Sequence, residues 1–366
     1  MIKDLKKTLK SNYRNLIYKL FFILYGKIIG KVSPDNEEDI EIKKISLEKN
    51  YSYKSYIIYN GRLYTDTIHD TAVILRNKIV ERASFQLRNN VNVNCEENVI
   101  FNKGTPRLKK KLKGTVLSLL TGGGGNSNYW HWLFDVLPRL HMASNFINHN
   151  QIDYYLFPDL KEKFQKETLD SLNLPNKKRI SSKSYRHFSA NKIIITDHPY
   201  NLLNDPLKDS LNIPYWIISF LRKKFLNEQS EQNQFPKKIY IDRSDSKSRH
   251  GEWRTILNET EVKKTLKDKG YEFLVLSNYR FMDQVKIFNQ AQSIVGLHGA
   301  GFANIVFCKH GTNVLELQSN TAGDIIKNIS EKNNLKYDSI SVKPKKATDN
   351  QLGHIEINIQ TLKDKI

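Results

Sequence analysis

Short apolar runs alternate with amphipathic stretches along the C-terminal half of the chain. Apolar runs of about five residues between turn residues are typical of buried strands, whereas apolar positions that recur with the period of a helix predict helices. We expect strands at 238–242, 271–276, 293–297 and 313–317, and helices at 259–269, 283–291 and 300–307. This alternation of strand and helix predicts a doubly wound, parallel sheet.

The N-terminal half is patterned differently. Residues 46–104 are rich in Tyr, Ile, Val and Thr and contain Asn60-Gly61, a dipeptide typical of β-hairpin turns. We therefore expect this portion to be β-rich. The later elements are expected as a helix from the glycine run to about residue 150, strands at 154–157 and 192–195, and a helix at 215–229.

The chain is long enough for two hydrophobic cores. Its 366 residues exceed a comfortable single core, and domains of about 100–200 residues are usual. The polar run 230–236 is the best candidate for a linker. We expect a basic N-terminal segment over 1–45, one domain over 46–229, a second over 236–345 and a tail over 346–366. The predicted fold class is α/β.

The first 32 residues mix basic and apolar positions. Lys19 interrupts their apolar stretch, and no run of 18 uncharged apolar residues occurs anywhere in the chain, so no transmembrane helix is expected. A small-residue cleavage site of the signal-peptide kind is also missing. A basic helix with aromatic and aliphatic residues suits the plane of a membrane interface. The alternative is an ordinary amphipathic helix that packs on the core.

The net charge of the chain indicates which classes of partner it can bind. Lys and Arg number 58 and Asp and Glu 38, a net charge of +20, which favours phosphate-bearing partners. The richness in Lys, Asn and Ile is also what an AT-rich genome produces, so we do not expect nucleic acid as the partner. Anionic lipid and small phosphate compounds remain. The two cysteines, Cys95 and Cys308, have no disulfide or zinc spacing, which fits a reducing cytosol.

A narrow polar stripe marks the helix expected after the glycine run Gly122–Gly125. At 100° per residue, its polar members fall within an arc of about 80°: Asn128, His131, Asp135 and Arg139. The rest of the circumference is apolar, so the helix is buried and the stripe is costly unless it faces a cleft.

The stripe contains a His–Asp pair one helical turn apart, His131 and Asp135. At this spacing the carboxylate can orient and tune the imidazole. Pro138 disturbs the helix nearby, as often happens beside functional sites, and the glycines before it leave backbone N–H groups free for an anion. The alternative is a buried pair that only holds the fold.

A second cluster follows the strand 293–297. His298 stands at its carboxyl end, and Gly299, Ala300 and Gly301 form the turn into a helix. Ligands of open α/β sheets bind at this edge, with phosphate at the helix start. The glycine spacing differs from the dinucleotide fingerprint, so a nicotinamide or flavin cofactor is disfavoured. His298 could donate to a phosphate oxygen, or could be structural.

Two more residues are expected near this edge. Arg243 ends the strand 238–242 and offers a guanidinium to a diphosphate. Glu316 ends the strand 313–317 and could accept two hydrogen bonds from a ribose diol. Its alternative is a buried acid paired with a lysine.

The ordered set of motifs over residues 55–320 resembles glycosyltransferase family 61, which includes bacterial capsular polysaccharide enzymes and eukaryotic N-acetylglucosaminyl- and xylosyltransferases. The matching motifs are Asn128-Tyr-Trp-His-Trp-Leu-Phe-Asp135, Leu137-Pro-Arg-Leu140, Ile239-Tyr-Ile-Asp-Arg243, Asn258-Glu259, and His298-Gly-Ala-Gly301 followed by Asn304, Phe307 and Glu316.

The resemblance implies a GT-B fold of two Rossmann-like domains facing a cleft. It also implies an inverting transfer from a nucleotide-sugar, by family habit a UDP-sugar, to a hydroxyl of a surface polysaccharide or lipid-linked glycan such as a capsule or lipopolysaccharide. The donor site is then expected at Arg243, His298, Gly299, Ala300, Gly301 and Glu316 in the C-terminal domain, with 46–229 on the acceptor side.

The base is expected to be Asp135 or His131, facing the cleft. Phosphate or acceptor contacts are expected from Asn128, Arg139, Arg254 and Asn304. Relatives commonly place two basic residues where Arg254 stands singly, while Arg249 lies in an apparent insertion.

We expect transfer without a metal or other cofactor, because no Asp-x-Asp dyad is suitably placed and Asp242 and Asp245 are the nearest approach. The expected location is the bacterial cytoplasm, with peripheral attachment through residues 1–32 to the inner face of the plasma membrane. Two rivals stay open. One is a polysaccharide pyruvyltransferase, which uses two similar lobes and phosphoenolpyruvate, and the other is a non-catalytic polysaccharide- or nucleic-acid-binding protein.

Overall fold

A computed structural model of the chain describes residues 2–49, 51–67, 70–84, 87–88, 91–120, 127–201, 205–226, 235–246, 254–345 and 353–366. The chain forms two compact units. Unit 1 comprises Met1–Glu162 and Leu174–Pro206, and unit 2 comprises Lys163–Asn173 and Leu207–Ile366. The expected boundary near residue 229 differs from this division, because the helices α5 (Lys163–Ser171) and α7 (Tyr215–Phe225) both belong to unit 2.

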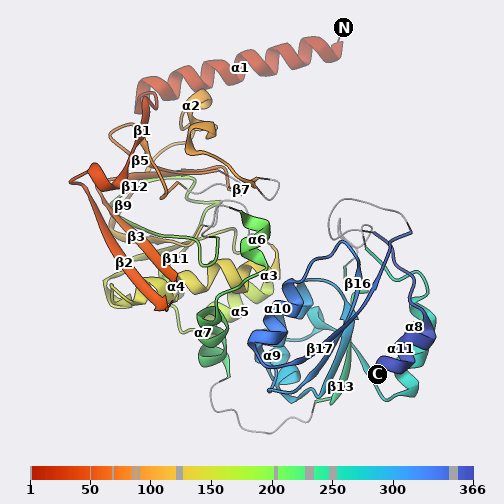
Figure 1. Cartoon of the computed structure of the whole chain (residues 1–366). Helices are drawn as coiled ribbons and strands as arrows, with labels where there is room; N and C mark the ends of the chain where they lie inside the picture. The colour runs from red at the N-terminus through yellow and green to blue at the C-terminus, as the bar shows by residue number, and fades with distance from the viewer. Residues whose placement is uncertain are drawn as a thin grey trace. The chain divides into compact units, whose positions relative to one another are not determined.

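Unit 1 is built on a mixed ten-stranded sheet (Figure 1). Its main path runs β1-β6-β5-β4-β12-β9-β10-β11, and the β2–β3 pair joins β12. The strands are β1 (Gly30–Val32), β2 (Ile40–Glu48), β3 (Tyr51–Tyr59), β4 (Arg62–Thr65), β5 (Thr71–Leu75), β6 (Lys78–Val80), β9 (Lys110–Ser118), β10 (Tyr154–Phe157), β11 (Arg179–Ser181) and β12 (His187–Thr196). The expected β-rich portion is confirmed, and it is continuous with the parallel strands β9 to β12.

The Asn60-Gly61 step is not a hairpin turn. The strands on either side of it, β3 and β4, do not pair with each other, because both run antiparallel to the same strand, β12. Asn60 adopts a positive φ of 52°, and its N–H donates to Asn191 O at 2.9 Å. Asn and Gly adopt positive φ values readily. The dipeptide is therefore suited to an irregular link between strands as well as to a hairpin turn. The dipeptide therefore links two strands, β3 and β4, that pair with successive parts of β12.

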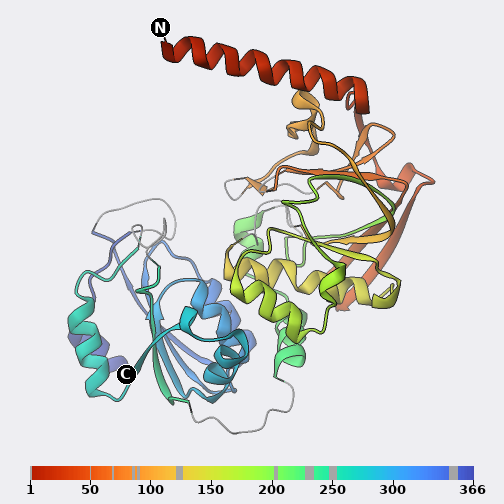
Figure 2. The ribbon, with the colours of Figure 1, turned by 180° about the vertical axis from the view of Figure 1, so that it is seen from behind.

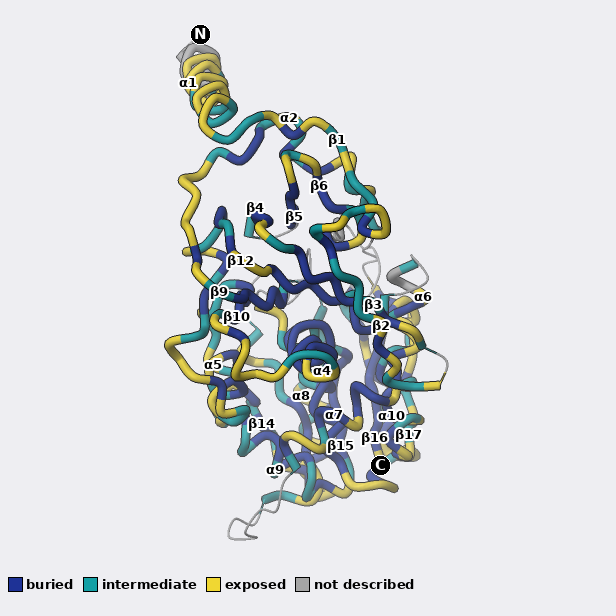
Figure 3. Tube along the Cα trace, turned by 90° about the vertical axis from the view of Figure 1, so that its left-hand side faces the viewer, coloured by how far each residue is buried: buried dark blue, intermediate teal, exposed yellow. Residues whose placement is uncertain are grey.

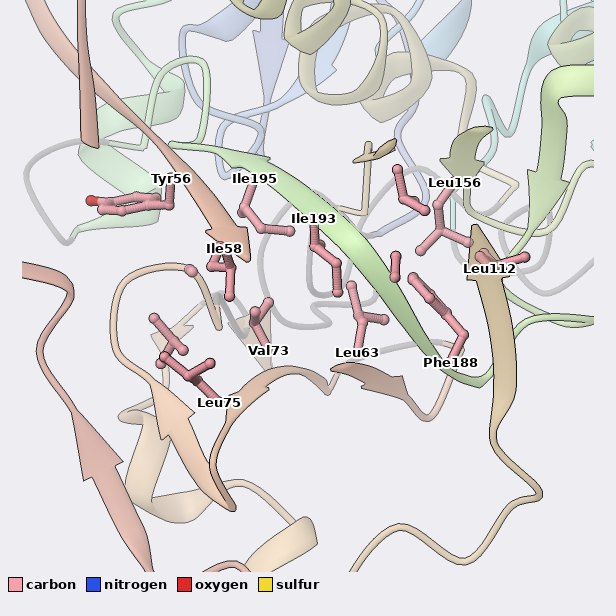
Figure 4. Close-up of a cluster of buried hydrophobic side chains, with 14 of the residues drawn as sticks. Tyr56, Ile58, Leu63, Val73, Leu75, Leu112, Leu156, Phe188, Ile193 and Ile195 are labelled. Carbon is pink, nitrogen blue, oxygen red and sulfur yellow. The ribbon is translucent and has the colours of Figure 1, made fainter. Parts of the chain in front are cut away.

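The core of unit 1 lies on the sheet. Buried side chains from β3, β4, β5, β9 and β12 form one cluster (Figure 4), which includes Tyr56, Ile58, Leu63, Val73, Leu112, Phe188 and Ile193. Removing this apolar surface from water is what stabilises the sheet. Further elements of unit 1 are α1 (Ile2–Tyr25), α2 (Ile100–Lys103), α3 (Tyr129–His131), α4 (Pro138–Ser144) and the β7–β8 pair (Leu87–Arg88, Val91–Asn92).

Unit 2 is the doubly wound, parallel domain that the C-terminal pattern predicts. Its five strands are all parallel, in the order β14-β13-β15-β16-β17. They are β13 (Lys238–Asp242), β14 (Glu272–Val275), β15 (Ser293–Leu297), β16 (Asn313–Ser319) and β17 (Lys336–Val342). The strand order reverses between β13 and β15, and such switch points are where doubly wound sheets bind ligands.

Helices cover both faces of this sheet, with α8 (Glu259–Asp268) and α11 (Ile359–Lys365) on one side and α9 (Phe281–Gln290) and α10 (Ile325–Lys332) on the other (Figure 1). The helix expected at 300–307 is a 3₁₀ helix, Ala300–Phe307. The segment expected as a separate tail belongs to unit 2, because Ile355, Ile357 and Leu362 pack in the same core as Tyr240 and Val295.

Figure 2 shows helix α1 extending from the rest of unit 1, and in Figure 3 its residues from Thr8 onward are exposed or half-buried. In the described part of the chain, no helix is long and apolar enough to cross a membrane. The glycines 122–125, most of the run 230–236 and Arg249 lie outside the described residues.

Candidate active site

A π-helical turn precedes Pro138 and shapes the first cluster. Asn128 caps the N-terminus of α3, since its side chain accepts from Trp130 N at 2.9 Å. The helix then widens into a π-helix over Trp132–Val136, where Leu137 N donates to Trp132 O at 3.1 Å. A π-turn accommodates proline, which has no N–H to continue the α-helical ladder. The expected disturbance at Pro138 is thus a change of helical register.

His131 and Asp135 form a hydrogen-bonded pair across this turn. His131 Nδ1 donates to Asp135 Oδ2 at 2.8 Å, and the His131 side chain is 34% exposed while that of Asp135 is 2% exposed. With Nδ1 bound to the carboxylate, Nε2 is the nitrogen that can meet a ligand. The buried acid orients the imidazole, and the imidazole is the group within reach of solvent.

Two residues after β12 complete the surroundings of Asp135. The Tyr200 hydroxyl donates to Asp135 Oδ1 at 2.7 Å, and His198 Nε2 lies 3.6 Å from Asp135 Oδ2. His198 Nδ1 accepts from Asn201 N at 3.0 Å. Because Nδ1 is an acceptor, the hydrogen of neutral His198 is on Nε2 and points toward the carboxylate.

These contacts set the charges of the cluster. Burial by itself raises the pKa of Asp135, but the charge and hydrogen bond of His131 and the hydrogen bond of His198 hold that pKa well below its usual range. Burial lowers the pKa of His131, and the Asp135 charge overcomes this and raises it above the usual value. Burial lowers the pKa of His198. Asp135 is therefore a carboxylate, and His198 is neutral at pH 7.

The sequence singled out the polar stripe but did not single out His198 and Tyr200. Both follow the carboxyl end of β12, which runs parallel to β9, and α3 lies beyond the carboxyl end of β9. Polar residues in Thr196-Asp-His-Pro-Tyr200 after an apolar strand were the available signal. The geometry brings them to the His131–Asp135 pair.

Arg139, expected to contact a ligand, is buried instead. It is 1% exposed, and its guanidinium donates to Asp135 O at 3.1 Å and to Thr196 O at 2.9 Å. These bonds tie α4 to β12. Burial lowers the pKa of Arg139 to about 10. Its role in this arrangement is to hold the backbone on which Asp135 lies.

The second cluster lies in unit 2, where two arginines converge on one carbonyl. Arg243, at the carboxyl end of β13, donates from Nη1 to His298 O at 2.6 Å, and Arg254 Nη1 donates to the same oxygen at 3.0 Å. Arg254 Nε is buried without a partner among the described residues. Burial, followed by the like charge of Arg243, lowers the pKa of Arg254 to about 10. The structure thus brings together two cations at the switch point of the sheet.

Gly299 makes room for this pair. A Cβ atom at Gly299 would lie 2.8 Å from Arg243 Nη1, closer than real side-chain contacts. The glycine is therefore required for the guanidinium to lie against the turn between β15 and the 3₁₀ helix.

His298 is held from behind by a buried acid. Its Nδ1 donates to Glu316 Oε1, and Tyr337 on β17 donates to Glu316 Oε2 at 2.7 Å. Glu316 is fully buried, with both oxygens occupied. This differs from the expected ribose contact, because the side chain is shielded from solvent and its oxygens are taken by His298 and Tyr337. Glu316 positions His298, whose Nε2 is the nitrogen left for a ligand.

Other expected contacts are structural or paired. Asn304 is fully buried and donates to Gln284 Oε1 at 3.1 Å. Asp242 forms an ion pair with Lys263 at 2.9 Å. The group of three possible metal ligands found among the described residues is Glu81, Cys95 and Glu96 in unit 1.

Comparison with protein families identifies the family of the chain. Residues 129–315 match the sequence model of the family described as Glycosyltransferase 61, a range that runs from the start of α3 into β16 and contains His131, Asp135, Arg243 and His298. Comparison with curated proteins gives no match. The protein is an enzyme of the glycosyltransferase class. The chain belongs to glycosyltransferase family 61.

Proposed function

We propose that the protein transfers a sugar, with inversion, from a UDP-sugar to a hydroxyl of a surface polysaccharide or lipid-linked glycan. Unit 2 binds the donor and unit 1 supplies the base, as the two lobes of a GT-B enzyme. The observation that carries this proposal is the convergence of Arg243 and Arg254 on His298 O. Two half-buried guanidinium groups beside each other favour an anion that they can share, and a diphosphate is such an anion.

The arginines stabilise the leaving group. When the bond between the anomeric carbon and the phosphate oxygen breaks, negative charge develops on the nucleoside diphosphate. Arg243 and Arg254 are fixed in place before this happens, and positioned charges in a partly dry site stabilise such a charge strongly. His298 Nε2 is suited to donate to a phosphate oxygen, since Glu316 holds its Nδ1.

His131 is the base in this proposal, and Asp135 orients it. The acceptor oxygen attacks the anomeric carbon, and its proton passes to His131 Nε2. The buried carboxylate keeps Nδ1 protonated and stabilises the imidazolium that forms. Asp135 is the weaker candidate for the base, because it is 2% exposed and its oxygens face His131, His198 and Tyr200.

Transfer is proposed to need no metal, since the arginines supply positive charge where the diphosphate binds. Asp242, which lies next to Arg243, forms an ion pair with Lys263. We place the reaction in the bacterial cytoplasm, in the synthesis of capsule, lipopolysaccharide or another envelope glycan.

Thermal unfolding of the full chain tests the donor assignment. UDP, GDP, CMP and phosphoenolpyruvate are compared, each with Mg²⁺ and with chelator. A ligand at a hundredfold its Kd stabilises the native state by about 2.7 kcal/mol. Stabilisation by UDP in chelator is the expected result. A response to phosphoenolpyruvate alone would replace the nucleotide-sugar with the pyruvyl donor.

A further inference from the structure

Helix α1 is fixed to unit 1 at its C-terminal end. A Cβ atom at Gly104 would lie 2.7 Å from the Phe22 ring, so the ring packs directly on this glycine. The Tyr25 ring meets His187 edge-on with centroids 4.9 Å apart, and the Tyr25 hydroxyl accepts from Lys109 N at 2.9 Å. The end of α1 is therefore held by groups far away in sequence.

The opposite face of α1 is apolar and exposed. Its members are Leu9, Tyr13, Leu16, Leu20, Ile23 and Leu24. At 100° per residue they fall within an arc of about 100°, on the side away from Phe22 and Tyr25. Leu16 is 65% exposed and Ile23 is 83% exposed. An exposed apolar stripe of this kind indicates a binding surface.

A second basic segment binds the Tyr25 side of the same end of the helix, which is the side away from the apolar stripe. The run 107–113 is bound there through the Lys109–Tyr25 hydrogen bond, and its Leu108 is 76% exposed. Ile29, just after α1, is 71% exposed. The basic residues of the run are all exposed: Arg107, Lys109, Lys110, Lys111 and Lys113.

The charges decide what this surface binds. Helix α1 contains one acidic residue, Asp4, and six basic residues, namely Lys3, Lys6, Lys7, Lys10, Arg14 and Lys19. A second copy of α1 would bring like charges together, whereas helix pairs are commonly matched by opposite charges beside their apolar seam. An anionic bilayer attracts the basic side chains and accepts the apolar stripe.

We propose that the apolar stripe of α1 and the basic residues beside it form a docking surface for an anionic lipid bilayer, with α1 lying in the plane of the membrane interface. The apolar stripe enters the headgroup boundary, and the basic residues beside it contact lipid phosphates. The surface lies entirely within unit 1 and acts independently of the sugar transfer.

Co-sedimentation of the full chain with vesicles tests the proposal. The vesicles contain phosphatidylcholine alone, or equal parts of phosphatidylcholine and phosphatidylglycerol. One variant carries Leu16→Gln, Leu20→Gln and Ile23→Gln, and its control is Leu257→Gln, which changes an exposed leucine of unit 2. Since all these side chains are exposed, the variants are expected to fold.

A second variant removes charge through Lys10→Gln, Arg14→Gln and Lys19→Gln. Its control removes the same charge from exposed lysines of unit 2, through Lys223→Gln, Lys224→Gln and Lys267→Gln. Matched net charge separates a local surface from general attraction by a basic protein.

We expect the wild type to bind anionic vesicles only. Its affinity for these vesicles should fall by a factor of about ten or more in both α1 variants and stay unchanged in both controls. Equal binding to neutral vesicles would overturn the anionic assignment. Equal loss in the lysine control would make the binding non-specific. Sedimentation as a dimer that the glutamine variant of the stripe converts to a monomer, without vesicle binding, would replace the membrane with a second copy.

Discussion

Arg243 and Arg254 come from segments on either side of an undescribed stretch, and both donate a hydrogen bond to the backbone oxygen of His298. A neutral carbonyl cannot balance two positive charges. The proposed diphosphate would balance these charges, and the first prediction follows from this relationship.

Replacing either arginine should weaken nucleotide binding. We expect Arg243→Ala and Arg254→Ala each to cost about 2 kcal/mol, or roughly thirtyfold in the Kd of UDP, because each removes a charge-assisted hydrogen bond. Calorimetric titration measures this. Lys264→Ala on α8, an exposed lysine of the same unit, is the control. Unchanged UDP affinity in both arginine variants would show that the diphosphate binds elsewhere.

Removing the proposed base should separate turnover from donor binding. His131→Gln should lower kcat by about 10²–10⁴, the usual contribution of a general base, while the Kd of UDP stays constant. The rate of product formation with a donor that the enzyme accepts measures kcat, and calorimetric titration measures the Kd of UDP. His310→Gln in unit 2 is the control. Full activity of His131→Gln would exclude the imidazole as the base.

The pH dependence of turnover should follow His131. A base acts in its neutral form, and Asp135 raises the pKa of His131, so kcat should rise with pH through a value above 6.5. Tyr200→Phe removes a hydrogen bond to Asp135 and leaves more of the carboxylate charge acting on His131. The rising limb should then move to higher pH.

The control for this shift is Tyr155→Phe, which removes another buried hydroxyl of unit 1, one that hydrogen-bonds His149. Its pH profile should match the wild type. A Tyr200→Phe profile that loses amplitude without moving would give Tyr200 a structural role only.

Acid should destabilise the protein through His187. Burial lowers the pKa of His187 to about 4, below the ordinary value near 6.5 of the unfolded chain. Its stabilising contribution is complete above pH 6.5 and is lost as pH falls toward 4, because the unfolded state then binds a proton that the native state does not. The loss is about 3 kcal/mol.

Denaturant unfolding at pH 7 and pH 4.5 measures this effect. His187→Phe keeps the ring between Tyr25 and Tyr64, and its free energy of unfolding should fall less between the two pH values than that of the wild type. An equal decrease in the free energy of unfolding in the variant and the wild type would mean that other groups cause the acid sensitivity.

The sequence predicted unit 2 well because its signals are local. The bounds of β13 and β15 agree with the expected strands, since each is a short apolar run between turn residues. Parallel strands share a carboxyl edge, so Arg243 and His298 could be expected near each other from their positions alone. The hydrogen bond from Arg243 to the backbone carbonyl of His298 could not be predicted in this way, because it depends on side-chain packing around Gly299.

The remaining features depend on contacts between distant segments. Asn60-Gly61 has the local signature of a hairpin turn. It does not form one, because both neighbouring strands pair with β12 instead of with each other. Glu316 was expected to face a ligand, but its register in β16 directs it to His298 and Tyr337. Tyr200 reaches Asp135 across 65 residues, a distance at which no spacing rule applies.

The path of the chain between the two units restricts how the enzyme can be made. Helix α5 belongs to unit 2, yet the segments before and after it belong to unit 1, and Glu167 of α5 accepts from Phe281 N at the start of α9. The central strand β12 of unit 1 leaves the ribosome only after α5. Neither unit is therefore encoded by one continuous stretch of the gene, and cutting the gene at any one codon would leave at least one of the two units incomplete.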